Sequence, residues 1–307
     1  MKKLLTLVVT LMLLAPCAAR AETVVTSFFP IYLFALNLCE GIDGLDVYSL
    51  TEPNTGCLHD YQLTTADMKM LSRADVFLLN GAGMESYLDF VFDAFPDLAT
   101  VDASEGVTLL CSEEHEHDGH EAHEHEGHDG HDHGESNAHI WLDPANARQM
   151  VRNLARGLAA RCPAYAAQLM DNCERYEARL EALDSELRAG LAGLKRRDII
   201  TFHEAFPYFA NAYGLHVAAV MTYEPEDTLS PRTLIRLIRE VEELGRPPLF
   251  IEPQYENIAA RTVARESGAS IWTLDPVVTS PGGDVPLDWY ETCMRSNMRV
   301  LQEALGE

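Results

Sequence analysis

Positive charge is scarce in this sequence. Its 307 residues include 23 Lys and Arg against 48 Asp and Glu, which gives a formal net charge of −25. A surface of that sign repels phosphate backbones and anionic lipid headgroups, so we expect no nucleic-acid partner. Hydrophobic residues still make up 47% of the chain, which excludes bulk disorder and predicts a packed globular protein. The acidic surface suits cationic ligands without indicating which one.

Long apolar runs are also missing beyond the N-terminus, where no stretch reaches the roughly 18 residues of a membrane span. The N-terminal run is shorter. Basic Lys2 and Lys3, apolar Leu4–Leu14 and a small-x-small triplet ending at Ala21 are typical of a signal peptide. We therefore expect cleavage after Ala21 and export to the periplasm. The alternative is a lipoprotein anchored at Cys17, although the proline before that cysteine argues against it.

The cysteines form no CxxC pair and no zinc-ribbon spacing, which argues against a thiolate metal site. An even number remains after the expected cleavage, and in an oxidising compartment this predicts disulfides of undetermined connectivity. One candidate pairing joins Cys162 to Cys173, which flank a helix break at Pro163. The remaining cysteines are Cys39, Cys57, Cys111, Cys162, Cys173 and Cys293.

The length predicts two domains, and apolar strand-like runs alternate with helical ones in both halves of the chain. This alternation is typical of βαβ units, so we expect an α/β fold with parallel-type sheets. In the first half we expect strands over 23–26, 45–50 and 75–79 and helices over 30–39 and 64–72. In the second half we expect strands over 198–201, 217–221, 248–251 and 270–274.

One amphipathic pattern is much longer than the others and runs from about 161 to 195. A helix of about 30 residues extends about 45 Å, enough to run the length of both domains. The predicted organisation is a signal peptide over 1–21, an N-terminal α/β lobe over 22–160, a linking helix over 161–195 and a C-terminal α/β lobe over 196–307.

Histidine is concentrated in one place, because eight of the 12 histidines fall within 112–136. This segment consists almost only of His, Glu, Asp and Gly, so it cannot bury enough apolar surface to offset its ordering entropy. We predict a mobile acidic loop with several weak, exchanging metal sites; a solvated linker without a metal role is the alternative. Its histidines are His115, His117, His120, His123, His125, His128, His131 and His133.

Outside this segment, His59, His139 and His203 share a setting, at or just past a strand or loop end and just before a helix. In open α/β sheets ligands collect at that edge. Neutral imidazole is also the commonest nitrogen ligand of Zn²⁺. Three such positions together predict a metal site. The fourth histidine, His216, lies at a strand start and is interpreted as an ordinary structural position.

Four motifs in order resemble the signatures of metal-binding substrate-binding proteins of ABC importers. They are GCLHDYQL over 56–63 with NGAGME over 80–85, HIWLDP over 139–144, FHEAFPYF over 202–209, and LDP over 274–276 after IEPQ over 251–254. The opening TSFFP over 26–30 fits as well. An acidic His-rich loop just before the second motif makes the sequence most similar to the ZnuA-type zinc-binding components.

The resemblance implies two α/β lobes joined by a long helix, with the metal in the cleft between them. Carried over by position, the ligands are His59 and His139 from the first lobe and His203 and Asp275 from the second. A water or another acid is the alternative fourth ligand, since Asp275 would also suit a helix N-cap before a proline. The motif residues Glu204, Tyr208 and Trp141 are interpreted as supporting the ligands and not as ligands.

The resemblance also implies a function without a chemical step: a monomer that captures Zn²⁺ in the periplasm and delivers it to a membrane permease with a cytoplasmic ATPase. Manganese- or iron-binding relatives tend to carry Glu in place of His203, and a third imidazole favours Zn²⁺ over the harder Mn²⁺. A manganese- or iron-binding member of the same importer family is the first alternative. The second is a zinc hydrolase, against which stand the absence of HExxH and of an evident general base.

Overall fold

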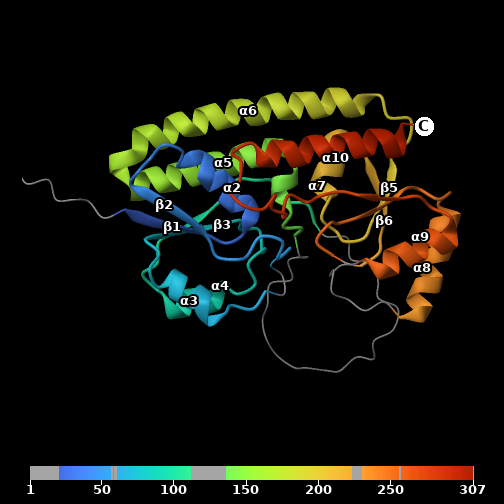
Figure 1. Ribbon diagram of the computed structural model, residues 1–307, viewed down its shortest axis with the longest axis horizontal. Coiled ribbons are helices and arrows are strands. Elements are labelled where there is room, and N and C mark those ends of the chain that lie inside the picture. The colour runs from blue at the N-terminus through green and yellow to red at the C-terminus, as the bar shows by residue number, and fades with distance from the viewer. Residues whose placement is uncertain are drawn as a thin grey trace, which may run out of the picture.

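Two lobes lie under one long helix. The computed structural model describes residues 21–56, 58, 61–111, 136–222, 230–255 and 257–306. It contains two sheets of parallel strands flanked by helices, and α6 (Ala166–Ala192) runs along both of them (Figure 1). This confirms the predicted α/β fold. The expected signal peptide and the His-rich segment lie outside the described residues, apart from their last residues.

Both sheets have four parallel strands in the same relative order, β2-β1-β3-β4 in the first lobe and β6-β5-β7-β8 in the second. In each lobe the first and third strands are therefore neighbours, which is the topological switch point where α/β sheets collect ligands. The first sheet consists of β1 (Glu22–Thr26), β2 (Leu45–Ser49), β3 (Val76–Leu79) and β4 (Thr100–Asp102). The second consists of β5 (Asp198–Thr201), β6 (His216–Val220), β7 (Leu249–Ile251) and β8 (Ile271–Thr273).

Helices connect these strands and cover the sheets. In the α3 connection, Thr64 and Asp67 form the reciprocal hydrogen bonds of a capping box, which confirms the helix start predicted there. The short β4, α4 and the long α10 were not predicted from the sequence. The helices are α2 (Phe29–Leu38), α3 (Thr65–Leu71), α4 (Leu88–Ala94), α5 (Pro144–Arg161), α7 (Pro207–Tyr213), α8 (Pro231–Glu243), α9 (Ile258–Ser267) and α10 (Trp289–Leu305).

The linking helix is shorter than expected, because Pro163–Tyr165 forms a separate 3₁₀ turn between α5 and α6. Its 27 residues still span about 40 Å. Its buried residues recur every three or four positions, so that one stripe faces α5 and α10 while the rest faces solvent. The buried apolar side chains of this stripe are Leu169, Cys173, Tyr176, Leu180, Leu183, Leu187 and Leu191.

A single apolar core continues from one lobe into the other. Trp141 from the first lobe and Tyr290 from α10 are both fully buried in it. Two buried hydrogen bonds cross the junction: Trp141 Nε1 donates to the carbonyl of Pro276 at 2.7 Å, and the Tyr290 hydroxyl donates to the carbonyl of Trp141 at 2.7 Å. A second, smaller core lies between the second sheet and the α8–α9 pair. The lobes are therefore joined by buried contacts as well as by α6.

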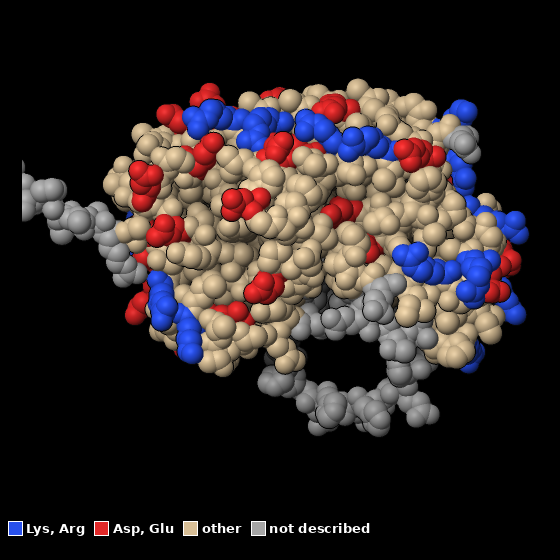
Figure 2. All heavy atoms as spheres, in the orientation of Figure 1, with Lys and Arg blue, Asp and Glu red and all other residues tan. Residues whose placement is uncertain are grey.

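The basic residues gather in rows despite the negative net charge. Figure 2 shows one row of Lys and Arg along the edge formed by α6 and α10. Two ion pairs join these helices: Arg179 of α6 pairs with Glu291 of α10, and Arg295 of α10 pairs with Glu186 of α6. Within the described part of the chain, no helix has the length and apolar composition of a membrane span.

The expected pairing of Cys162 with Cys173 is wrong. Both thiols are free, and Cys173 Sγ faces the carbonyl of Val151 at 4.0 Å. Val151 lies 11 residues before Cys162 along α5, which is about 16 Å of helix. Because α5 and α6 lie side by side, Cys173 packs against the middle of α5, while Cys162 lies at its end.

Gly157 gives a test of the packing between α5 and the first sheet. A Cβ at this position would lie 2.4 and 2.5 Å from the two methyl carbons of Val101 on β4. We expect Gly157→Ala to lower the free energy of unfolding by about 1–3 kcal/mol, although alanine is ordinarily the better helix former. Urea denaturation of the two proteins measures this difference.

The matched control is Gly193→Ala, since nothing lies within 4 Å of a Cβ there and the φ of −85° suits alanine. It should change stability by less than about 0.5 kcal/mol. Adding Val101→Ala to Gly157→Ala should recover part of the loss. Equal stability of the wild type and Gly157→Ala would contradict the packing seen between the helix and the sheet.

Candidate metal centre

His203 lies at the carboxyl end of the second sheet. It follows β5 by two residues, precedes α7 and is 1% exposed. Glu252 follows β7 directly, and β5 and β7 are parallel neighbours, so their ends bring the two side chains together. His203 Nδ1 lies 3.1 Å from Glu252 Oε1. The carboxylate accepts this hydrogen bond, so Nδ1 carries the proton and Nε2 carries the lone pair that a metal binds.

Glu252 is itself held in place. Its second carboxylate oxygen accepts a hydrogen bond from Gln254 Nε2 at 2.6 Å, and its backbone carbonyl accepts one from Asn257 Nδ2 at 2.8 Å. The residue is 2% exposed. Sequence reasoning placed Glu252 in a motif and gave it no role. Its position directly after a buried strand could have indicated a role at the sheet edge. That it contacts His203 could be inferred only once β7 was known to pair with β5.

His139 reaches the same region from the first lobe. It lies just before a 3₁₀ helix, Ile140–Leu142, that leads into α5, and it is 2% exposed. Its Nδ1 lies 3.1 Å from Asn137 Oδ1. The Asn137 amide is oriented by two further bonds, since Nδ2 donates to the carbonyl of Glu204 and Oδ1 accepts from the backbone N–H of His139. His139 therefore also donates through Nδ1 and carries its lone pair on Nε2.

The two imidazoles lie edge to face. Their ring centroids are 5.0 Å apart and their planes meet at 72°. Trp141 packs against His139 with a centroid distance of 5.2 Å, which fits its expected supporting role. Two buried imidazoles from different lobes, each with Nδ1 bonded to an oxygen, are suited to share one cation through Nε2.

Tyr208 supports this junction, as expected for a residue that does not ligate. Its hydroxyl donates to the carbonyl of Asn137 at 2.7 Å and accepts a hydrogen bond from the backbone N–H of Leu110 at 3.0 Å. Tyr208 belongs to α7 of the second lobe, whereas Asn137 and Leu110 belong to the first. The hydroxyl therefore fixes the segment that carries His139 against the lobe that carries His203.

Among the described residues, Asp275 forms no three-residue group of potential metal ligands with the two histidines. Its carboxylate accepts hydrogen bonds from the backbone N–H of Val277 at 2.8 Å and from the Thr279 hydroxyl, and Cys293 Sγ lies 3.9 Å from it. Burial raises the pKa of the carboxyl, while the hydrogen bonds from Thr279 and Val277 lower it. No helix follows Asp275, so the alternative role of a helix N-cap is wrong. The side chain instead closes its own loop.

The remaining predicted ligands lie outside the described residues. These are His59 and all eight histidines of the His-rich segment. Leu58, which precedes His59, is fully buried, and its N–H points to Met84 Sδ at 3.5 Å. Within the described ranges, no three His, Cys, Asp or Glu side chains form a group that could hold a metal.

The two ends of the His-rich segment meet beside the histidine pair. Cys111 and Ser136 form an antiparallel bridge, and the backbone N–H of Asn137 donates to the carbonyl of Leu110 at 2.9 Å. Ser136, the last residue of the segment, therefore lies three residues before His139. His216, in contrast, lies on the exposed start of β6, where its Nδ1 is 2.9 Å from Asp198 Oδ1. Its interpretation as an ordinary structural position stays a prediction.

A buried carboxylate supports the first lobe behind His139. Glu85 accepts hydrogen bonds from the backbone N–H groups of Asn80 and Gly81 at 2.7 and 3.1 Å. The Asn80 side chain in turn donates to the carbonyl of Ala138, the residue before His139, at 3.0 Å. Burial raises the pKa of Glu85 to about 7, against hydrogen bonds from Ser27, Asn80 and Gly81 that lower it. The sequence analysis placed Glu85 in a motif and did not predict that it supports the segment carrying His139.

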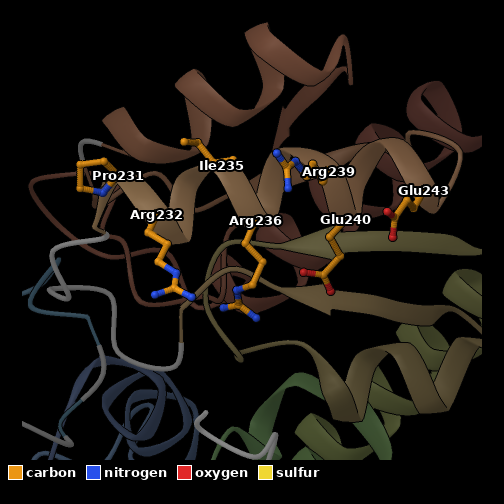
Figure 3. Close-up of a pocket in the computed structure, with 7 residues that line it drawn as sticks. All are labelled: Pro231, Arg232, Ile235, Arg236, Arg239, Glu240 and Glu243. Carbon is orange, nitrogen blue, oxygen red and sulfur yellow. The ribbon is translucent and has the colours of Figure 1, made fainter. Parts of the chain in front are cut away.

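A surface pocket on α8 is not a candidate for the metal. It is lined by Arg232, Arg236 and Arg239, with the exposed Ile235 and two glutamates beside them (Figure 3). Guanidinium groups remain protonated at all physiological pH values and repel cations. The buried histidine pair is therefore the better candidate for a metal site.

Fold and site together define a metal-binding substrate-binding protein with two lobes. The family profile described as zinc-uptake complex component A periplasmic, ZnuA, matches residues 24–304. The chain belongs to the ZnuA family. This is a family of binding components of metal uptake and not of enzymes.

Relatives named for different metals match over nearly the whole chain. The high-affinity zinc uptake system protein ZnuA of Brucella suis biovar 1 (strain 1330) is 30% identical, covering 94% of this chain and 93% of the relative. The iron-binding protein YfeA of Yersinia pestis is 26% identical, covering 94% and 88%. The solved structure of a ZnuA 138–173 deletion mutant with zinc bound matches with a TM-score of 0.74 at 26% identity, covering 93% of this chain and 98% of that chain.

Glu85 predicts a pH dependence of stability. A folded pKa of about 7, above the unfolded value of 4.5, means that the folded chain binds more protons between these values. The free energy of unfolding should therefore fall as pH rises from about 5 to 8, by up to about 3 kcal/mol from this group. Glu85→Gln cannot titrate and should flatten the dependence. Urea denaturation of metal-free protein at several pH values measures the slope.

The control is Glu303→Gln on the exposed side of α10, which should keep the wild-type slope. Asp102 lies near enough to raise the pKa of Glu85 further, so Asp102→Asn should move the transition toward lower pH. An identical slope in the wild type and Glu85→Gln would show that the buried carboxyl does not titrate in this range.

Proposed function

We propose that this protein captures Zn²⁺ in the periplasm and delivers it to the permease of an ABC importer driven by a separate ATPase. The observation that carries the proposal is the buried pair of His139 and His203, whose rings meet across the two lobes at 5.0 Å. Ligands from separate lobes suit capture and release, because a relative movement of the lobes changes the site. The relative from Brucella, named for zinc uptake, supports the same metal.

The proposed ligands are His59, His139, His203 and Asp275. The two described histidines present the tautomer that a metal needs, since an oxygen occupies each Nδ1. Asp275 has weaker support, because hydrogen bonds from its own loop already engage its carboxylate. A water molecule is the alternative fourth ligand. Three imidazoles make the site nitrogen-rich, which favours Zn²⁺ over Mn²⁺.

An iron- or manganese-binding role is the second candidate, since YfeA is named as iron-binding and aligns over most of this chain. His203 argues against it, because a carboxylate in that position would suit a harder metal better. A zinc hydrolase is less well supported. Glu252, the carboxylate bonded to His203, contacts the Nδ1 side of the ring and so orients the ligand instead of facing a metal-bound water.

The His-rich segment is proposed to collect zinc through several weak, exchanging sites. Its eight histidines provide the ligands, and its ends at Cys111 and Ser136 lie beside the segment that carries His139. Zinc held there would be released close to the main site. Export with cleavage after Ala21, with a lipid anchor at Cys17 as the alternative, and a monomeric state complete the proposal.

Alanine substitutions test the ligand set by calorimetric titration of metal-free protein with Zn²⁺, using a competing chelator. His139→Ala and His203→Ala should each weaken binding by more than about 100-fold, since loss of an outer partner of a ligand already costs about 10- to 100-fold. Glu252→Gln should fall within that smaller range. His216→Ala should bind as the wild type does.

Asp275→Ala distinguishes Asp275 from a water molecule as the fourth ligand. A loss comparable to that of the histidine variants supports Asp275, and a loss below about 10-fold supports water. Tight binding retained by both His139→Ala and His203→Ala would overturn the proposed site.

Removal of the His-rich segment tests its role separately. Because Cys111 and Ser136 are bridged, a short Gly-Ser turn can replace residues 112–135 without moving the ends. The shortened protein should keep one tight zinc site of unchanged affinity, from which Mn²⁺ does not displace the zinc. It should no longer bind the additional, weakly held zinc ions. If tight binding disappears with the segment, the buried histidines are not the main site.

A further inference from the structure

Two buried cysteines of the first lobe lie at equivalent positions, each as the residue that ends a helix. Cys39 caps α2 and Cys162 caps α5. Both are free thiols and nearly inaccessible, at 8% and 4% exposure. Because each residue follows the last turn of its helix, neither backbone is confined to the helical repeat.

Three contacts bring the chain around Cys39 against the chain around Cys162. The Asn172 side chain, on the first turns of α6, donates to the carbonyls of Leu38 and Glu40 at 2.8 and 2.9 Å and so holds both neighbours of Cys39. The turn after Cys39 continues to Gly44, where a Cβ would lie 1.7 Å from the Tyr165 hydroxyl. The backbone N–H of Tyr165 donates to the carbonyl of Cys162 at 3.0 Å.

Cys162 also lies close enough to Cys39 to influence it electrostatically. Burial raises the pKa of Cys39 to about 12, and the charge of Cys162 is the second cause. The other described cysteines lie elsewhere: Cys173 faces the middle of α5, Cys293 lies beside Asp275 in the second lobe, and Cys111 is exposed.

We propose that Cys39 and Cys162 form a disulfide that joins the C-terminal ends of α2 and α5 in the exported protein. The proposal rests on the export that is part of the proposed function. The thiolate of one cysteine attacks an oxidant's disulfide and displaces one of its sulfurs. The second cysteine's thiolate then attacks the mixed disulfide and displaces the other. The protein loses two electrons and two protons, and the disulfide oxidant is reduced to its two thiols.

Burial decides when this bond forms. Two thiols at 8% and 4% exposure are poorly accessible to an oxidant, and the raised pKa of Cys39 leaves little thiolate. We therefore place oxidation during folding, before α2 and α5 close over the pair. The bond would enclose the chain from 39 to 162 and stabilise the first lobe chiefly by restricting the unfolded chain.

The test uses a chain without residues 1–21 in which Cys57, Cys111, Cys173 and Cys293 are replaced by serine. These replacements matter because trypsin leaves Cys57 in the peptide of Cys39, and Cys173 in that of Cys162. After refolding from the reduced, denatured state in a glutathione redox buffer, we expect the two peptides to be linked and neither thiol to react with maleimide in denaturant. The melting temperature should fall by about 5–10 °C on reduction.

The matched control adds Cys39→Ser and Cys162→Ser, and its melting temperature should not respond to reductant. The wild-type chain, refolded in the same way, should also carry the 39–162 link. Two maleimide-reactive thiols after oxidative refolding, or a wild-type link from Cys39 to another cysteine, would overturn the proposal. Zinc affinity, measured on the same samples, tests the proposed function independently, because Cys162 lies at the opposite end of α5 from His139.

Discussion

The apolar core shared by the two lobes is the interaction on which the rest of the structure depends. The buried stripe of α6 packs against α5 of the first lobe and α10, which follows the second sheet. Removing this apolar surface from water fixes the lobes relative to each other, beyond the connection that the backbone of α6 already provides. The site needs that fixed relation, because His139 and His203 come from different lobes and meet only at the junction.

Hydrogen bonds between the lobes set their relative position more accurately than the apolar core does. The bonds from Trp141 to Pro276 and from Tyr290 to Trp141 set the distance between the lobes next to the site. The bonds of Asn137 and Tyr208 then set the orientation of the segment that carries His139. Since these bonds cross between lobes, any movement that opens the site must break buried hydrogen bonds, each of which contributes about 1 kcal/mol. This favours small movements over wide opening.

Each histidine is oriented toward a possible cation by a hydrogen bond from its Nδ1, and the acceptor differs between the two. Asn137 presents a neutral amide oxygen to His139, whereas Glu252 presents a carboxylate to His203. The carboxylate orients the second imidazole and also brings negative charge close to a bound cation. Glu85 acts further away, through Asn80 and the carbonyl of Ala138. The acidic composition of the chain thus includes a few buried acids with specific partners.

The sequence by itself determined the α/β class, the long linking helix, the start of α3 and the two histidines at strand or loop ends, because these follow from local periodicity and capping chemistry. Only the tertiary structure decided the partners of those histidines, since Glu252 meets His203 through the neighbouring β5 and β7. It also overturned the pairing of Cys162 with Cys173, which are near in sequence but separated by about 16 Å of α5. Strand order and helix packing are long-range properties, and local sequence patterns do not encode them.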